Sequence, residues 1–119
     1  MKKSSGIGLA YKGKKIIINA RKCSPIMEAV GLMFSRREKA EALLFDFSGR
    51  GEYMLHSFFV FFPFLAVWLD GKNRISEIMV VMPFSFGIKP KKRFSKIVEI
   101  PINRRYKEII KKLVGKRKV

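Results

Sequence analysis

The chain holds a single histidine, His56, the residue type best suited to proton transfer near neutral pH. A catalytic base also needs a partner that orients it, and a nucleophile or a water to activate. Ser57 follows it directly, but neighbours on a strand point to opposite faces, so the two are not a natural pair. No Gly-x-Ser-x-Gly segment accompanies them. We therefore expect a hydrogen-bonded structural histidine.

Other chemistry is poorly supported by the sequence. Metal binding would have to draw on one histidine, the lone Cys23 and nine carboxylates without ligand spacing. Gly6-Ile7-Gly8 and Gly13-Lys14-Lys15 lack the Gly-x-x-x-x-Gly-Lys-Ser/Thr frame of a phosphate loop. Asp46, between two phenylalanines, is expected to face solvent or to pair with a basic neighbour. We predict no cofactor and no metal site, and an enzyme is the less favoured alternative.

Positive charge is the dominant feature of the composition. The chain has 26 Lys and Arg residues against 9 Asp and Glu, a formal net charge of +17. Such an excess favours anionic partners, whether nucleic acid, phospholipid or acidic protein. The alternative is that the lysines are solvated and only maintain solubility.

The cations form three groups. The first group runs from the end of a predicted loop into the short strand near Ile97. The second lies on the predicted last helix, and the third is an Arg-Arg pair. These candidate anion-binding residues are Lys89, Lys91, Lys92, Arg93 and Lys96; Arg104, Arg105, Lys107, Lys111 and Lys112; and Arg36 and Arg37. Such groups attract phosphate backbones without sequence preference.

Exposed aromatic residues among these cations would favour RNA recognition. Phe84, Phe86 and Phe94 flank the first group. Large aromatic side chains are more often buried, so core anchoring is the favoured interpretation for all three.

Three functions follow. The first is a non-catalytic module that binds RNA or another polyanion. The second is a small-molecule-binding or weakly enzymatic domain with a pocket near His56. The third is peripheral binding to an anionic membrane through basic and phenylalanine side chains. Monomer and homodimer both stay open.

The elements that must position these residues are organised around the stretch from His56 to Asp70. It has no charged residue between Phe58 and Leu69 and is rich in aromatics. A membrane helix needs roughly 20 apolar residues, and Pro63 interrupts this shorter run. We therefore predict two buried strands in succession, followed by a turn at Asp70-Gly71.

This stretch resembles the signature of a family known only as domain of unknown function 192. Other boxes occur in the same order, including Gly31-Leu32-Met33-Phe34, Ala42–Phe47 and Glu99-Ile100-Pro101. The resemblance covers residues from about Asn19 to the end of the chain. It implies a compact, mostly β domain and gives no catalytic residue to carry over.

The chain departs from the family pattern at four positions. Phe61 stands where the family often has Arg or Lys, and Leu65 where it usually has Asp. Asn103 replaces a common Gly, and Lys116 replaces a final Asp. If those basic and acidic residues form a polar site in the family, this chain lacks two of its members.

Local patterns predict the remaining elements. Ile7–Tyr11 and Lys15–Ala20 form a hairpin, and a short helix covers residues 25–31, started by Ser24-Pro25. Leu43–Phe47 is a strand, and a strand from about Arg74 to Met82 returns antiparallel to the one before. Residues 83–93 form a loop and another short strand follows, near Ile97.

The final predicted element is an amphipathic helix over residues 103–113, with Asn103 as its cap. Its apolar face is formed by Ile102, Tyr106, Ile109, Ile110 and Leu113.

Together these elements predict a mainly β fold, an antiparallel sandwich or distorted barrel. We expect one domain over residues 1–119, with frayed basic tails at 1–6 and 115–119. No secretory signal is visible, and the single cysteine fits the cytoplasm.

Overall fold

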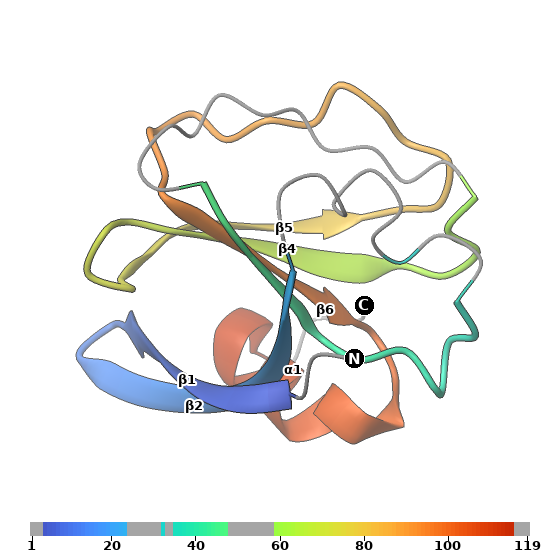
Figure 1. Cartoon of the computed structure of the whole chain (residues 1–119), viewed down its shortest axis with the longest axis horizontal. Coiled ribbons are helices and arrows are strands. Elements are labelled where there is room, and N and C mark those ends of the chain that lie inside the picture. Colours follow the sequence, from blue (N-terminus) through green and yellow to red (C-terminus); the bar gives the residue numbers. More distant parts are fainter. Residues whose placement is uncertain (1–3, 24–31, 33–34, 48–58, 116–119) are drawn as a thin grey trace.

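The structure is a computed structural model. It describes residues 4–23, 32, 35–47 and 59–115. The described chain is mainly β, with six strands in one sheet and one short helix near the end (Figure 1). The strands are β1 Ser4–Tyr11, β2 Lys14–Cys23, β3 Leu43–Asp46, β4 Phe64–Leu69, β5 Ile75–Val81 and β6 Lys96–Pro101.

The sheet curls into a half-open barrel with the strand order β1-β2-β3-β6-β4-β5. β6 lies at its centre and pairs antiparallel with both β3 and β4. At the two ends of the sheet, an isolated bridge joins Ala10 of β1 to Arg74, the residue before β5. The predicted distorted barrel is thus confirmed, although β2 and β3 run parallel, so a purely antiparallel sheet was wrong.

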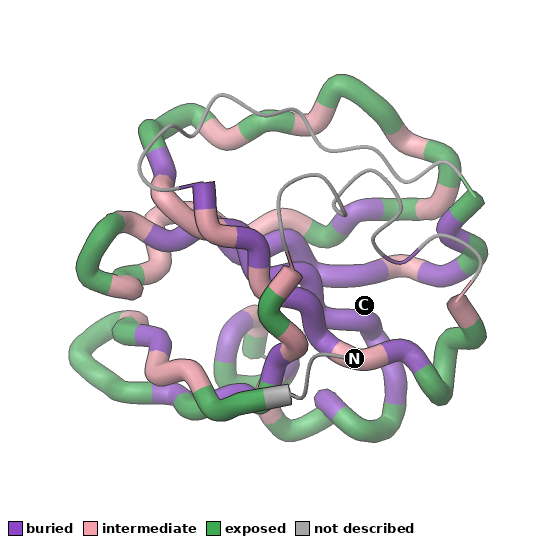
Figure 2. Tube along the Cα trace, in the orientation of Figure 1, coloured by how far each residue is buried: buried purple, intermediate pink, exposed green. Residues whose placement is uncertain are grey.

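Both faces of the central strands are buried (Figure 2). Alternate residues of β4 belong to two apolar clusters: Leu65, Val67 and Leu69 face the C-terminal helix. Phe64, Ala66 and Trp68 face the opposite cluster, which the connecting segments complete with Leu32, Val60, Phe62 and Phe94. Parts of the loops therefore act as a second covering layer.

The predicted N-terminal hairpin is confirmed. β1 and β2 pair antiparallel, and both central residues of the turn, Lys12 and Gly13, have positive φ angles of 49° and 77°. Such a turn matches the twist of paired strands. Ser4–Gly6 pairs with β2 as part of β1, so the predicted fraying of residues 1–6 was wrong for these three positions.

The aromatic stretch contains one described strand, not two. Residues 59–63 are irregular, and β4 begins only at Phe64. Phe59 has a φ of 61° and Pro63 has no N–H to donate, so neither suits a continuous ladder. Val60 and Phe62 still enter the core. In the described ranges, no helix is long and apolar enough to span a membrane.

The return strand is confirmed as β5, antiparallel to β4. The predicted C-terminal helix is a 3₁₀ turn at Arg104–Tyr106 followed by α1, Lys107–Val114, and Gly115 ends it with a φ of 70°. Its apolar face packs on the sheet as expected. The helix predicted at 25–31 lies outside the described residues.

Asn103 precedes this helix, but its side chain does not cap it. The Nδ2 group instead donates to the carbonyls of Arg37 and Ala40, at 2.6 and 3.1 Å. The predicted cap was therefore wrong: the amide ties the helix start to the 36–40 turn.

A buried hydrogen bond joins the helix region to the sheet. The Ala42 N–H donates to the Tyr106 hydroxyl at 2.7 Å, just before β3 begins.

We expect Tyr106→Phe to lower the free energy of unfolding by about 1–3 kcal/mol, because it leaves a buried N–H without an acceptor. Urea denaturation measures this change. The half-buried Tyr11→Phe is the control, and an equal loss from both would contradict the role given to this bond.

Asp70 organises the β4–β5 turn. Its burial raises its pKa, but N–H groups of Arg74 and Lys72 and the Arg74 guanidinium act more strongly, so the pKa lies below the usual 3.8. Because the folded pKa is depressed, this stabilisation is present above the unfolded pKa and is lost as pH falls through the folded value. We expect the free energy of unfolding of Asp70→Asn to fall less steeply with decreasing pH than that of the parent protein, as measured by urea denaturation across an acid pH series. An identical dependence of unfolding free energy on pH in the variant and the parent would contradict this role of Asp70.

Candidate nucleic-acid interface

The three predicted groups of cations gather into two regions of the structure. Residues 83–95 form a loop between β5 and β6, at the top of Figure 1. The helix that carries Arg104–Lys112 lies at the bottom of the same view. The principal extents of the molecule are 34 × 31 × 30 Å, so a short ligand cannot cover both regions.

The 83–95 loop is anchored at defined points. Phe94 is buried and contacts Phe47 edge to face, with ring centroids 5.7 Å apart, while Ile88 packs against the same cluster. The Lys91 N–H donates to the Glu77 carboxylate of β5 at 2.9 Å. These contacts fix the loop on the sheet.

Phe84 and Phe86 precede these anchors in the loop, and both are exposed. Their exposed fractions are 52% and 73%, against 3% for Phe94. The prediction that all three anchor the core is therefore confirmed for Phe94 and wrong for the other two. Phe61 packs edge to face on Phe84, with centroids 5.4 Å apart, and is itself exposed.

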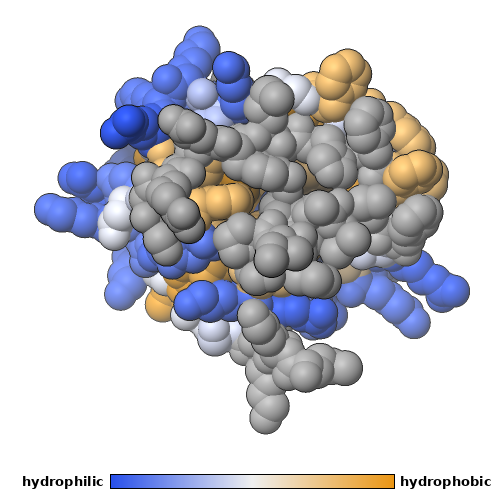
Figure 3. Space-filling view, turned by 45° about the horizontal axis from the view of Figure 1, so that its top comes forward, coloured by the Kyte–Doolittle hydropathy of each residue, from blue (hydrophilic) through white to orange (hydrophobic). Residues whose placement is uncertain are grey.

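These rings belong to a larger apolar area on the molecular surface. Figure 3 shows apolar side chains gathered on the same face as strongly hydrophilic ones. Phe61, which contacts Phe84, and Met82, two residues before Phe84 in the chain, are also exposed.

The loop also presents cations. Lys89, Lys91, Lys92 and Arg93 are all exposed, and among the described residues none of them lies within ion-pair distance of a carboxylate. Lys96 differs from them. It is half-buried at the start of β6, and its Nζ donates to Asn73 Oδ1 at 2.7 Å, so it braces the β4–β5 turn.

The second region unites the other two predicted groups. Arg37 Nε donates to the Ile102 carbonyl at 2.7 Å, and the Arg104 N–H donates to Glu38 at 3.0 Å. These bonds place the Arg36–Arg37 turn beside the helix. A hollow of about 310 Å³ lies between them, lined in part by Arg37, Lys107 and Lys111.

Acidic residues are interspersed in this second region. Glu41 lies 3.7 Å from Arg105 and Glu108 lies 3.9 Å from Lys111. Each exposed pair stabilises little, but each lowers the local positive potential. The helix surface therefore offers less free cationic charge than its sequence indicates, and it has no exposed aromatic among the residues described there.

Two features were missed by the sequence analysis. Lys12, Lys14 and Lys15 form a further cationic group at the hairpin tip. Their dense spacing is visible in the sequence, but it matches no phosphate loop, and the sequence analysis otherwise placed these lysines only in the predicted hairpin. Glu99, in central strand β6, is a carboxylate only 3% exposed. Its neighbours in the sequence gave no sign of this burial.

The other predicted site lies beyond the described chain. His56, the proposed pocket residue, is outside the described residues. Within the described ranges, no group of three or more His, Cys, Asp or Glu residues could hold a metal ion.

No protein-family model and no curated protein matches the sequence. Two solved structures share its fold. A protein of unknown function from Novosphingobium aromaticivorans DSM 12444 aligns with a TM-score of 0.71 and 12% identity, over 89% of this chain and 78% of its own. A "putative transcription regulator" from Sinorhizobium meliloti 1021 aligns with a TM-score of 0.67 and 20% identity, over 92% and 86%. At these identities the likeness establishes the fold alone.

Proposed function

We propose that this protein is a non-catalytic binding module for a polyanion, with single-stranded RNA as its partner, and that the 83–95 loop is the binding surface. The observation that carries this proposal is the exposure of Phe84 and Phe86 on the same loop as Lys89, Lys91, Lys92 and Arg93.

This combination suits single-stranded nucleic acid. Aromatic rings stack on unpaired bases, at about 1–3 kcal/mol per base, while cations follow the phosphate backbone. Cations alone bind any polyanion. The rings are therefore the feature that distinguishes this loop from the basic helix surface.

The backbone at Phe84 adds support. Its φ is 60°, a conformation that a bulky residue adopts at a cost and that glycine would adopt freely. Exposure of the ring is also unfavourable. The presence of a phenylalanine here despite both costs fits a binding role.

The comparisons add modest support. One protein with this fold is described as a putative transcription regulator, which is compatible with nucleic-acid association. A cytoplasmic location, which the single cysteine fits, is part of the same proposal.

We expect Phe84→Ser/Phe86→Ser to weaken binding of a labelled oligouridine by at least about tenfold, since two stacking surfaces are lost. Lys91→Ala/Lys92→Ala/Arg93→Ala should also weaken binding and lower the slope of log affinity against log salt by about 2. Fluorescence anisotropy across a salt series measures both changes.

The charge-matched control is Lys107→Ala/Lys111→Ala/Lys112→Ala on the helix, and Ile17→Ser controls for loss of an exposed apolar side chain. Both should retain most of the affinity. If the helix triple weakens binding more than the loop triple, or if heparin displaces the RNA from parent and phenylalanine variants alike, the loop is not an RNA site. Stronger binding to anionic vesicles than to RNA would instead identify a membrane surface.

A further inference from the structure

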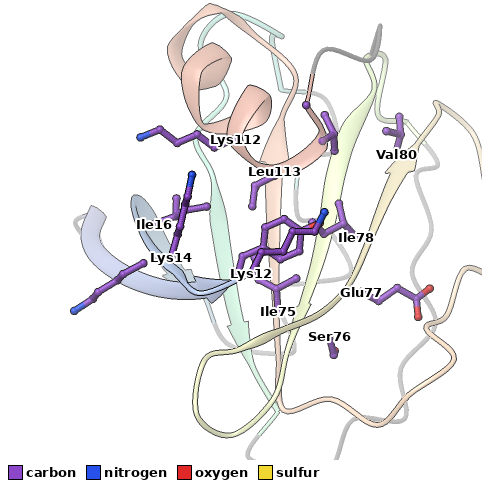
Figure 4. Close-up of a pocket in the computed structure, with 14 residues that line it drawn as sticks. Lys12, Lys14, Ile16, Ile75, Ser76, Glu77, Ile78, Val80, Lys112 and Leu113 are labelled. Carbon is purple, nitrogen blue, oxygen red and sulfur yellow. The ribbon is translucent and has the colours of Figure 1, made fainter.

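A groove opens where the barrel fails to close. It lies between the tip of the β1–β2 hairpin, the outer edge of β5 and the end of α1 (Figure 4), and its volume is about 1090 Å³. No residue of the 83–95 loop lines this groove, and the sequence gave no sign of it.

The floor of this groove is aliphatic. Ile75, Ile78 and Val80 reach it from β5, Leu113 from α1 and Ile16 from β2. The isoleucines and Leu113 belong to or pack against the core cluster under α1. Val80 is 41% exposed. The groove therefore exposes the margin of the core, which further apolar groups could cover favourably.

One wall is the edge of a strand. β5 is the last strand of the sheet. Just before it begins, the Asn73 carbonyl accepts a hydrogen bond from the Ala10 N–H at 3.0 Å. Beyond that point, no backbone hydrogen bond among the described residues joins β5 to any element except β4. An open edge of this kind is a template on which another extended segment can pair.

The rim is positively charged by Lys12, Lys14, Lys15 and Lys112. Figure 4 shows Lys12 extending across the groove towards Ile78, whereas the Glu77 carboxylate points away from the labelled lysines. That carboxylate accepts the Lys91 N–H on its far side. Within the described chain, none of the four lysines forms an ion pair.

The backbone at Lys12 is informative as well. Its φ of 49° suits asparagine or glycine better than lysine. A lysine at this position places its charge over the groove at a conformational cost.

We propose that this groove binds an extended acidic peptide of a partner protein, which adds as a strand to the free edge of β5. Its apolar side chains would cover the aliphatic floor, and its carboxylates would meet the lysine rim. The seven residues of β5 span roughly 23 Å, enough for a peptide of similar length. This proposal does not depend on RNA binding by the loop.

Charge argues against two other occupants. The last residues of the chain include Lys116, Arg117 and Lys118, and a second copy would bring a net charge of +17. Both are repelled by a lysine rim, whereas an acidic segment is attracted.

The test uses a fluorescein-labelled peptide of about seven residues, matched to β5, that alternates valine with aspartate and glutamate. Two derivatives carry N-methyl groups on alternate amides, shifted by one residue relative to each other. Strand addition engages only every second N–H, so one derivative should lose binding by at least about tenfold while the other retains it. Anisotropy titration of the full chain measures all three.

Two pairs of variants locate the site. Lys14→Glu/Lys112→Glu should weaken binding by at least about tenfold, and the charge-matched Lys39→Glu/Lys107→Glu much less. Val80→Asn should weaken it at constant charge, and Ile17→Asn, an exposed change outside the groove, should not. Circular dichroism confirms that each variant is folded.

Several results would overturn the proposal. These are absence of binding, equal binding of both N-methyl derivatives, or equal effects of the two charge-matched pairs. Concentration-dependent dimerisation abolished by Val80→Asn would assign the groove to a second copy. Displacement of the peptide by oligouridine, with oligouridine binding also lost in Lys14→Glu/Lys112→Glu, would make it a polyanion site instead.

Discussion

The complete burial of strand β4 is the constraint on which the rest of the structure depends. All six of its residues are buried, so apolar side chains must be covered on both faces of one sheet. α1 covers one face, and connecting segments cover the other through Val60, Phe62 and Phe94. β6, paired on both sides, holds the two halves of the sheet together.

Covering both faces of β4 has two consequences at the molecular surface. A segment that covers a sheet with some of its side chains projects others outwards, and the 83–95 loop does so with Phe84 and Phe86. A sheet of six strands that is pinned at one bridge but not closed also leaves an edge, along β5. The two proposed binding surfaces therefore arise from how the core is covered, and each has cations beside exposed apolar groups.

Local features of the fold could be predicted from the sequence, because their causes are local. The Lys12-Gly13 turn, the β4–β5 connection and the apolar face of the last helix each follow from residues close together in the chain. The parallel pairing of β2 with β3 and the central place of β6 depend on contacts distant in sequence. Asn103 shows the same limit: it stands at a capping position, but a distant turn offers its amide better partners.

The site was predictable only in part for related reasons. Phe84, Phe86 and Phe94 look alike in sequence, and only the position of the β-sheet beneath the loop decides which are buried. The helix cations were visible, whereas Glu41 and Glu108, which reduce their effect, act through spatial proximity. The groove brings together residues from three separate elements and has no signature along the chain.

We propose that the 83–95 loop, rather than total charge, recognises the partner. The most direct measurement is an NMR titration of the labelled protein with oligouridine at physiological salt, followed through backbone amide and phenylalanine ring signals. Recognition by the loop predicts saturable shifts concentrated at Phe84, Phe86 and Lys89–Arg93, with α1 little changed. Shifts confined to α1, or small changes spread over every exposed lysine, would contradict it.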